Sequence, residues 1–262
     1  MDFIGIMKAC LMVGGTGLLI GVLLGIAGKF LAVKTDEKVE AIRELLPGNN
    51  CGGCGYPGCD GLAEAIASNN AAPSACPVGG AKVANGIGEL LGVSCEVVRK
   101  VAYVKCNGDC NNTTHKYDYT GNMTCADVAV VTVGGPKSCD YGCLGYGSCV
   151  SVCDKNAIRI LNGIAVVDKE KCYACGKCVK ACPKGLIEII QYDSKYHVAC
   201  SSIDRGVDVK KACKTGCIGC KLCEKNCENN AVVVENNIAK IDYDKCTNCG
   251  ACAKKCPSKI IR

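Results

Sequence analysis

The chain contains 262 residues, of which 27 are Cys, while aromatic residues make up 5% and Trp is absent. So few large aromatic side chains exclude one large conventional core and favour small modules held together by cysteine chemistry. The formal net charge of +6 at pH 7 omits any metal cofactor that these cysteines bind, so it does not identify a partner by itself.

Cysteines at this density form either disulfides or metal sites. A secreted disulfide scaffold is disfavoured because the number of cysteines is odd and because they recur in triplets with two residues between neighbours. Zinc is the weaker alternative, since it also uses histidine and the chain has only 2 His. The pattern Cys-x-x-Cys-x-x-Cys-x-x-x-Cys-Pro, in which x is any residue, is instead typical of bacterial ferredoxins.

Residues 9–28 form an uncharged stretch flanked by a lysine on each side, and a stretch of about twenty residues predicts a helix that spans a bilayer. Within it, Gly17, Gly21 and Gly25 lie on one helical face, a pattern that allows another transmembrane helix to approach closely. Glycines that only face lipid, or a cleaved signal peptide, remain alternatives.

Basic residues follow this stretch more often than they precede it, so the positive-inside rule predicts that the body of the protein is cytoplasmic. The stretch has no ionisable group at its centre, and we interpret it as an anchor rather than an ion path. The basic residues that follow are Lys29, Lys34, Lys38 and Arg43.

A charged helix is expected over residues 34–46, leading into the motif LPGNNCGGCGYPGC, and a helix rich in Ala is expected over residues 62–67. The glycines of the motif let the backbone fold closely around an inorganic core. Four thiolates in this arrangement predict an iron–sulfur site, although their spacing alone also suits zinc. The candidate ligands are Cys51, Cys54, Cys59 and Cys76.

Residues 95–138 are less informative because their cysteines have no regular spacing and residues 111–122 read as a polar turn. A buried free Cys often serves as a small apolar residue, so we expect a loop with free thiols, and an additional cluster is the alternative. The cysteines concerned are Cys95, Cys106, Cys110 and Cys125.

The second half of the chain is an internal repeat with a period of 74 residues. Each unit also contains two apolar runs across a turn, at Asn162-Gly163 in the first unit and Asn236-Asn237 in the second, which predicts a β-hairpin in each. The repeating cysteines are Cys143, Cys149, Cys153, Cys172, Cys175, Cys178 and Cys182, which recur as Cys217, Cys223, Cys227, Cys246, Cys249, Cys252 and Cys256.

Two four-cysteine blocks per unit are typical of a two-cluster ferredoxin, in which the fourth Cys of each block reaches across to the other cluster. This rule predicts two ligand sets in the second unit and at least one in the first. The sets are Cys217, Cys220, Cys223 and Cys256; Cys246, Cys249, Cys252 and Cys227; and Cys172, Cys175, Cys178 and Cys153.

The remaining set of the first unit lacks one thiolate, because Tyr146 stands where the repeat has Cys220. A phenol with a pKa near 10 is a poor replacement for a thiolate. We expect Cys139 to fold back and fill the gap, so that Cys139, Cys143, Cys149 and Cys182 bind one cluster while Cys213 is dispensable. A first unit with a single cluster and a free Cys139 is the alternative.

The motifs LPGNNCGGCGYPGC and YGCLGYGSC, together with an N-terminal span and two ferredoxin units, resemble the B subunit of the Rnf complex, a membrane-bound ferredoxin:NAD oxidoreductase that couples electron transfer to sodium or proton translocation. The first motif is also similar to one in a corrinoid iron–sulfur protein. The resemblance to the Rnf subunit therefore depends on the combination of this motif with the N-terminal span and the two ferredoxin units. The resemblance implies an electron-transfer subunit that accepts electrons from reduced ferredoxin and relays them toward membrane subunits. The NAD site and the flavins are then in other chains.

The expected architecture is an α+β chain with one N-terminal transmembrane helix, a small helical 4Fe-4S domain and two tandem ferredoxin-like modules, carrying about five 4Fe-4S clusters. We expect a single-pass protein of the cell membrane facing the cytoplasm, with ferredoxin, other subunits of the complex and the membrane as partners and no nucleic acid. The expected segments are the anchor at 1–33, the helical domain at 34–94, a connecting region at 95–138, and modules at 139–199 and 200–262.

No catalytic constellation is expected, and we interpret His115 and His197 as structural residues. A non-catalytic iron–sulfur sensor or scaffold is the competing class, but several redundant sites argue against it. Residues 200–262 contain 12 Lys or Arg against 7 Asp or Glu, whereas residues 139–199 contain 8 against 6. The C-terminal module is therefore the better candidate for docking an acidic carrier such as a ferredoxin.

Overall fold

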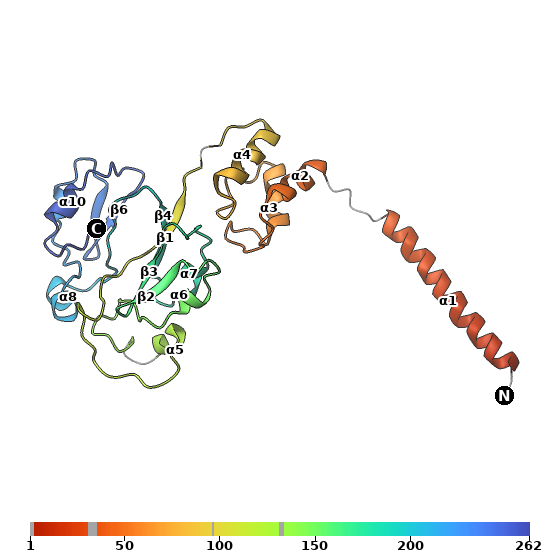
Figure 1. Ribbon diagram of the computed structural model, residues 1–262, viewed down its shortest axis with the longest axis horizontal. Helices are drawn as coiled ribbons and strands as arrows, with labels where there is room; N and C mark the ends of the chain where they lie inside the picture. The colour runs from red at the N-terminus through yellow and green to blue at the C-terminus, as the bar shows by residue number, and fades with distance from the viewer. Residues whose placement is uncertain (1–2, 31–35, 96, 131–133) are drawn as a thin grey trace. The chain divides into compact units, whose positions relative to one another are not determined.

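The structure is a computed structural model that describes residues 3–30, 36–95, 97–130 and 134–262. The chain divides into two compact units, Met1–Ala41 and Ile42–Arg262, which are described separately. Figure 1 shows a long helix in the first unit, and several short helices and strand pairs in the second.

The first unit contains helix α1 (Phe3–Phe30) and the beginning of α2 (Glu37–Leu45). Large apolar side chains of α1, such as Leu11 and Leu18, are exposed, and a Cβ built at Gly17, Gly21 or Gly25 would meet no atom within 4 Å. Among the residues that the structure describes, none of the helices combines the length and the apolar character needed to cross a membrane.

The second unit opens with the end of α2, followed by α3 (Cys59–Ala67) and α4 (Gly80–Leu91), which confirms the two helices expected on either side of the first cysteine motif. Apolar residues at helical spacing bury one face of each, including Leu62 and Ile66 of α3 and Ile87 of α4. Helix α4 ends at Gly92, whose φ of 70° is the left-handed conformation that commonly closes a helix.

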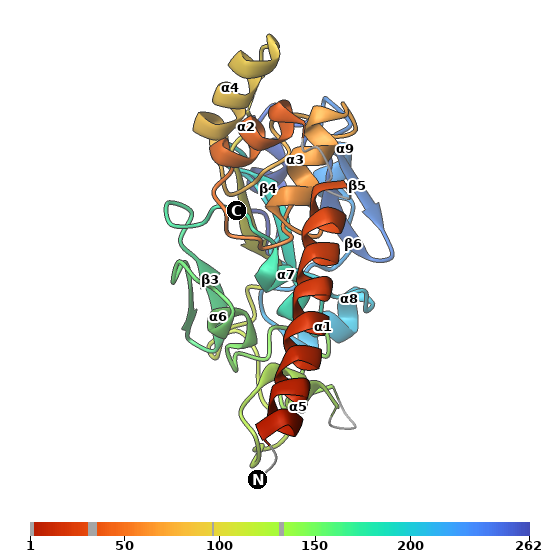
Figure 2. The ribbon, with the colours of Figure 1, turned by 90° about the vertical axis from the view of Figure 1, so that its right-hand side faces the viewer.

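Both predicted hairpins are present and identical in register. Strands β2 (Ile158–Leu161) and β3 (Ile164–Val167) pair antiparallel from Ile158 to Val167, and β5 (Val232–Glu235) and β6 (Ile238–Ile241) pair from Val232 to Ile241. Each paired residue of the second hairpin lies one repeat period after its equivalent in the first, which confirms the structural duplication. In both views of the ribbon the two hairpins lie apart from one another (Figures 1 and 2).

Short helices accompany each hairpin and carry one buried Cys each. The first module has α6 (Ser148–Ser151) and α7 (Lys177–Ala181), and the second has α9 (Leu222–Lys225) and α10 (Ala251–Lys255). The buried cysteines are Cys149, Cys178, Cys223 and Cys252, which follow the repeat.

The connecting region contributes elements that the sequence did not predict. Strand β1 (Lys100–Val104) pairs antiparallel with β4 (Ile187–Gln191) at the end of the first module, and α5 spans Cys125–Val130. The second module contains a further helix, α8 (Gly206–Ala212). In the second module a single bridge between Val198 and Ile261 is the counterpart of the β1–β4 pair. Residues 95–138 are therefore partly built into the first module.

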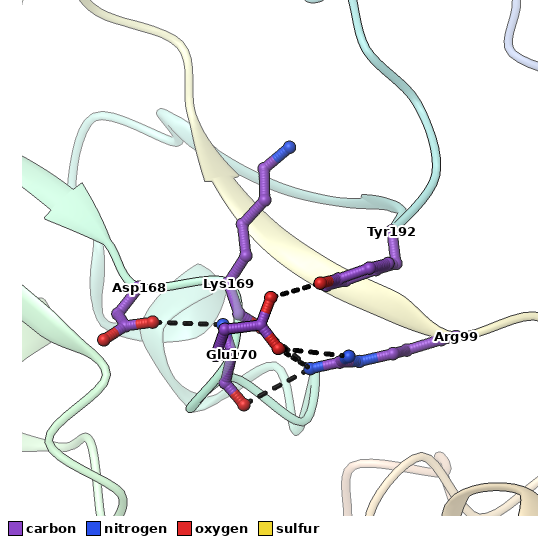
Figure 3. Close-up of polar contacts among 5 residues, drawn as sticks. All are labelled: Arg99, Asp168, Lys169, Glu170 and Tyr192. Atoms are coloured by element: carbon purple, nitrogen blue, oxygen red, sulfur yellow. Dashed lines mark hydrogen bonds and ion pairs between the residues drawn. The ribbon is translucent and has the colours of Figure 1, made fainter.

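Side-chain contacts fix β1 against both modules. The Arg99 guanidinium lies 3.8 Å from the centre of the Tyr192 ring, and it donates hydrogen bonds to the Glu170 carboxylate at 3.4 and 3.5 Å and to the carbonyl oxygens of Lys169 and Glu170 at 3.2 Å (Figure 3). These contacts hold the start of β1 against the loop that leads to Cys172.

On the other side, Tyr103 of β1 packs against His197, whose Nδ1 lies 3.0 Å from the Tyr243 hydroxyl. Burial, with the charge of Lys169, lowers the pKa of His197 to about 4, so this imidazole is neutral and fits the structural role expected for it.

A glycine in each module touches the hairpin turn. A Cβ at Gly145 would lie 2.5 Å from the Gly163 carbonyl oxygen, and one at the repeat-equivalent Gly219 would lie 3.0 Å from the Asn237 carbonyl oxygen. Both glycines have a positive φ, at 83° and 65°, so a side chain is disfavoured by conformation and by space.

We predict that Gly145→Ala lowers the free energy of unfolding by at least ~2 kcal/mol, from the left-handed backbone and the clash together. Gly185→Ala is the matched control, because Gly185 also has a positive φ of 60° but has no atom within 4 Å of its Cβ position. It should cost about 1 kcal/mol. Anaerobic urea unfolding followed by far-UV circular dichroism measures both, and equal effects would contradict the proposed contact.

Candidate metal centres

Every cysteine whose side chain is described is a free thiol, and the structure gathers most of them into groups of four. The clearest group lies in the second module, where Cys217, Cys220, Cys223 and Cys256 line one cavity that encloses about 330 Å³, counting space open to solvent. Burial, with smaller contributions from the other three thiols of the group, raises the pKa of Cys223 to about 11. The structure thus brings this predicted set together.

Two more predicted sets are adjacent in the same way. Burial, with smaller contributions from the thiols of Cys172, Cys175 and Cys153, raises the pKa of Cys178 to about 11. Burial also raises the pKa of Cys252, and the thiols that add to the increase are those of Cys246, Cys227 and Cys249. Each group contains three cysteines of one block and the fourth cysteine of the other.

The first motif forms a loop ahead of α3 that is closed by Asn50, whose side-chain oxygen accepts a 2.8 Å hydrogen bond from the Cys59 backbone N–H. Burial raises the pKa of Cys76, and Cys54 and Cys59 raise it further, which places these three thiols together. The loop also touches the first module, because a Cβ at Gly53 would lie 2.6 Å from the Cys175 carbonyl oxygen.

At the gap opposite Tyr146 the structure places a different thiol from the expected one. Cys143, Cys149 and Cys182 line a cavity of about 380 Å³ together with Cys125, and Cys139 is not among the residues that line it. Burial, with smaller contributions from the thiols of Cys143, Cys125 and Cys182, raises the pKa of Cys149 to about 12. Cys125, and not Cys139, is thus the fourth thiol that lines this cavity.

The local structure explains this exchange. Cys125 begins α5, and its backbone N–H donates a 3.0 Å hydrogen bond to the Ser148 hydroxyl, which fixes α5 against the start of α6. Cys139 instead begins a tight turn in which the Gly142 N–H donates to its carbonyl oxygen, and its side chain lines a different cavity. No local pattern pointed to Cys125, because it lies far from the repeat and in a region without periodicity.

The groups fit polynuclear iron–sulfur cores. No group of three or more His, Cys, Asp or Glu among the described residues is arranged to hold a metal ion directly. In a 4Fe-4S core each thiolate ligates its own iron, so the four sulfurs surround a cavity instead of meeting at a point. The cavities described above have this form, and several of the thiols that line them, such as those of Cys149 and Cys223, are buried.

Backbone amides also point at several of these sulfurs, an arrangement that tunes iron–sulfur potentials. The Ala157 N–H donates to Cys153 and the repeat-equivalent Ala231 N–H donates to Cys227, each at 3.3 Å. The Ala102 N–H of β1 donates to Cys172 at 3.3 Å, so the unpredicted strand contributes to a predicted site.

A duplicated hairpin module with interleaved sets of four cysteines defines a ferredoxin-type iron–sulfur protein. Family models agree along the chain: "Putative Fe-S cluster" matches residues 46–78, "LdpA Fe-S cluster-binding domain" matches 136–193 and "4Fe-4S dicluster domain" matches 216–260. The chain therefore carries several 4Fe-4S clusters.

Relatives extend the comparison over nearly the whole chain. The B subunit of the ion-translocating oxidoreductase complex of Methanosarcina acetivorans is 46% identical over 94% of both chains. The B subunit of the Na(+)-translocating ferredoxin:NAD(+) oxidoreductase complex of Acetobacterium woodii is 46% identical over 95% of this chain and 75% of its own. A proton-translocating counterpart from Clostridium ljungdahlii is 40% identical over 94% and 88%.

The chain belongs to this family of B subunits, which confirms the resemblance to the B subunit of the Rnf complex. It is an electron-transfer subunit, and its partners include other subunits of a complex.

We predict that Cys125→Ser removes one cluster, a loss of about four irons per chain, because serine oxygen is a weaker ligand than thiolate for iron–sulfur cores. Cys110→Ser is the control, since Cys110 is exposed and lines none of the described cavities. Iron and sulfide are determined after anaerobic purification. Full iron content in Cys125→Ser would contradict the corrected ligand set.

Proposed function

We propose that this chain accepts electrons from reduced ferredoxin and relays them one at a time toward the membrane subunits of an ion-translocating ferredoxin:NAD oxidoreductase. The observation that carries the proposal is the succession of four-cysteine groups within one compact unit of a chain from this family. We propose five 4Fe-4S clusters on these groups. Their ligands are the predicted cysteines, with Cys125 in place of Cys139.

When bound, each cluster supplies a one-electron couple, and the protein supplies position and surroundings. The groups are close neighbours in the chain's fold. The Cys51 thiol is near enough to contribute to the raised pKa of Tyr173, whose main cause is burial, and Gly53 touches Cys175. This contact supports electron transfer between the first motif and the first ferredoxin module.

Electron entry is assigned to the second module. Among the cysteines of the proposed ligand sets, Cys220 and Cys249 are the exposed ones among the described residues, and both belong to this module. The same module has a basic excess, and it carries exposed lysines such as Lys225 of α9 and Lys254 of α10. An acidic carrier is attracted to such a surface before it docks.

We also propose that α1 anchors the chain as a single-pass membrane helix, with residues 34–262 on the cytoplasmic side. The support is the uncharged stretch at residues 9–28, the exposed apolar side chains of α1, and the basic residues that follow. The division into an anchor, a helical domain, a connecting region and two modules belongs to the same proposal, with the connecting region contributing β1 and α5 to the first module.

Reduction by ferredoxin tests the function directly. Anaerobic full-length protein mixed with reduced ferredoxin should show rapid electron paramagnetic resonance signals from several reduced, interacting clusters. Failure of all clusters to reduce would contradict the proposal.

Lys254→Glu should slow this reduction several-fold at low ionic strength, and the effect should shrink in high salt because charge steering is screened. Lys180→Glu is the matched control, since Lys180 is the repeat-equivalent exposed lysine on α7 of the first module. Equal slowing in both variants would place the docking surface elsewhere.

For the anchor, we predict that Gly21→Leu weakens assembly with the membrane subunits, because a bulky side chain holds a neighbouring helix away. The clusters should be unaffected. Leu18→Ala is a control at an exposed position of the same helix. Copurification from membranes measures assembly, and normal assembly after all three glycines become leucine would show that they do not face another helix.

A further inference from the structure

Four cysteines outside the sets above line the same cavity. Cys106, Cys139, Cys200 and Cys213 surround about 440 Å³, counting space open to solvent. On the same measure, the two cavities lined by proposed cluster ligands enclose about 380 and 330 Å³. The cavity at these four cysteines is therefore similar in size to those at the proposed cluster ligands.

We propose that these four cysteines bind an additional 4Fe-4S cluster, whose ligands come from both ferredoxin modules and from the connecting region. Cys106, Cys200 and Cys213 lie outside the residues matched by the family models. The proposal goes beyond the five-cluster electron path and does not depend on ferredoxin being the donor.

The internal symmetry of the chain supports this site. Cys139 and Cys213 are separated by the repeat period. The other two cysteines are equivalent through the backbone: the Lys105 N–H donates to the Leu186 carbonyl at 2.8 Å, and the Ala199 N–H donates to the Ile260 carbonyl at 2.9 Å.

Leu186 and Ile260 are also separated by the repeat period, and the residue after each donor is a cysteine, Cys106 in one case and Cys200 in the other. Each module therefore contributes the same pair of thiols to the shared cavity.

The hydrogen bonds to the sulfurs repeat in the same way. The Cys143 N–H donates to the Cys106 sulfur at 3.3 Å, and the repeat-equivalent Cys217 N–H donates to the Cys200 sulfur at 3.4 Å. Amide donors to cysteine sulfur also occur at the proposed cluster ligands. The cavity thus has the surroundings of a cluster site on both of its sides.

Contacts around the glycines bring the sulfurs together. A Cβ at Gly108 would lie 3.6 Å from the sulfurs of both Cys106 and Cys213, and one at Gly142 would lie 3.6 Å from that of Cys139. Burial raises the pKa of Cys139 to about 11, and the thiols of Cys106, Cys200 and Cys213 add to the increase. All four thiols are therefore neighbours.

A buried cation also favours a negatively charged occupant. Lys137 lines the cavity and is 4% exposed, and its ammonium donates to the carbonyl oxygens of Gly108 at 3.0 Å and Gly163 at 2.7 Å. Within the described ranges it forms no ion pair with a carboxylate. Burying a lone ammonium is costly, and a 4Fe-4S core with four thiolates, which is negatively charged, is a suitable counter-charge.

The site joins the two modules. Cys106 belongs to the buried core of the first module, and Cys200 packs against that of the second. Further bonds run between the connecting region and the second module, including the Thr113 hydroxyl to the Ala212 carbonyl at 2.7 Å. Filling the cavity would therefore hold both cores in one arrangement.

The test is the iron and sulfide content of anaerobically purified, reconstituted full-length protein. Wild type should hold about 24 irons per chain, against about 20 if the site does not exist. Cys139→Ser and Cys213→Ser should each lose about four irons and four sulfides, and the double variant should lose the same four, because both residues serve one cluster. Cys125→Ser combined with Cys139→Ser should lose about eight, and the control Cys110→Ser should lose none.

Full iron content in Cys213→Ser would overturn the proposal, as would an additive loss in the Cys139→Ser, Cys213→Ser double variant. Loss of one metal ion without sulfide would also overturn it, in favour of a mononuclear site. If the variants fail to fold, the iron content of the wild type still distinguishes a chain with this site from one without it. A wild type with about 20 irons that is reduced by ferredoxin would overturn this site and leave the proposed function intact.

Discussion

The arrangement of the second unit depends on one constraint: four thiolates must surround each inorganic core at a fixed separation. The packing of large apolar side chains contributes less to the stability of this unit. The largest fully buried side chains are Ile, Leu and Val, such as Ile42, Leu186 and Ile260, and each hairpin has only four residues per strand. Two short strands and two short helices are marginal alone. Their stability therefore depends on cluster ligation, because metal binding contributes directly to the folding free energy of such small domains.

The two ferredoxin modules have the same geometry and differ at one cysteine position. Register, glycine contacts and amide-to-sulfur bonds repeat at the same offset, so the repeat preserves geometry as well as sequence. The exception is Tyr146, which replaces the ligand that Cys220 provides in the second module. We propose that Cys125 on α5 supplies the missing thiol, because it lines the cavity with the other three cysteines of that set. Cys139 lies instead with its counterpart Cys213 at the cavity shared by the modules, so a single exchange of cysteines accounts for both proposed sites.

Several features of the fold could be predicted because they depend on residues close together in the sequence. These are the hairpins, the helices beside the first motif and the cysteine blocks of the repeat. Contacts between residues far apart in the sequence were not predicted. Strand β1 is a short apolar run with no turn signal to its partner β4, and its pairing joins residues far apart in the chain. Cys125, Cys106 and Cys200 likewise become neighbours of other cysteines only through tertiary structure. Proximity in sequence favoured Cys139 for the gap at Tyr146, and the turn that follows Cys139 directs its side chain elsewhere.

The central claim is that each cavity surrounded by four thiols binds a polynuclear iron core. Anomalous scattering at the iron absorption edge, from anaerobically grown crystals of the full chain, measures this most directly. The account predicts compact multi-iron density inside the cavities lined by Cys220, by Cys125 and by Cys200, and at the three other cysteine groups. Single-metal peaks at these positions, or cavities closed by disulfides, would contradict it.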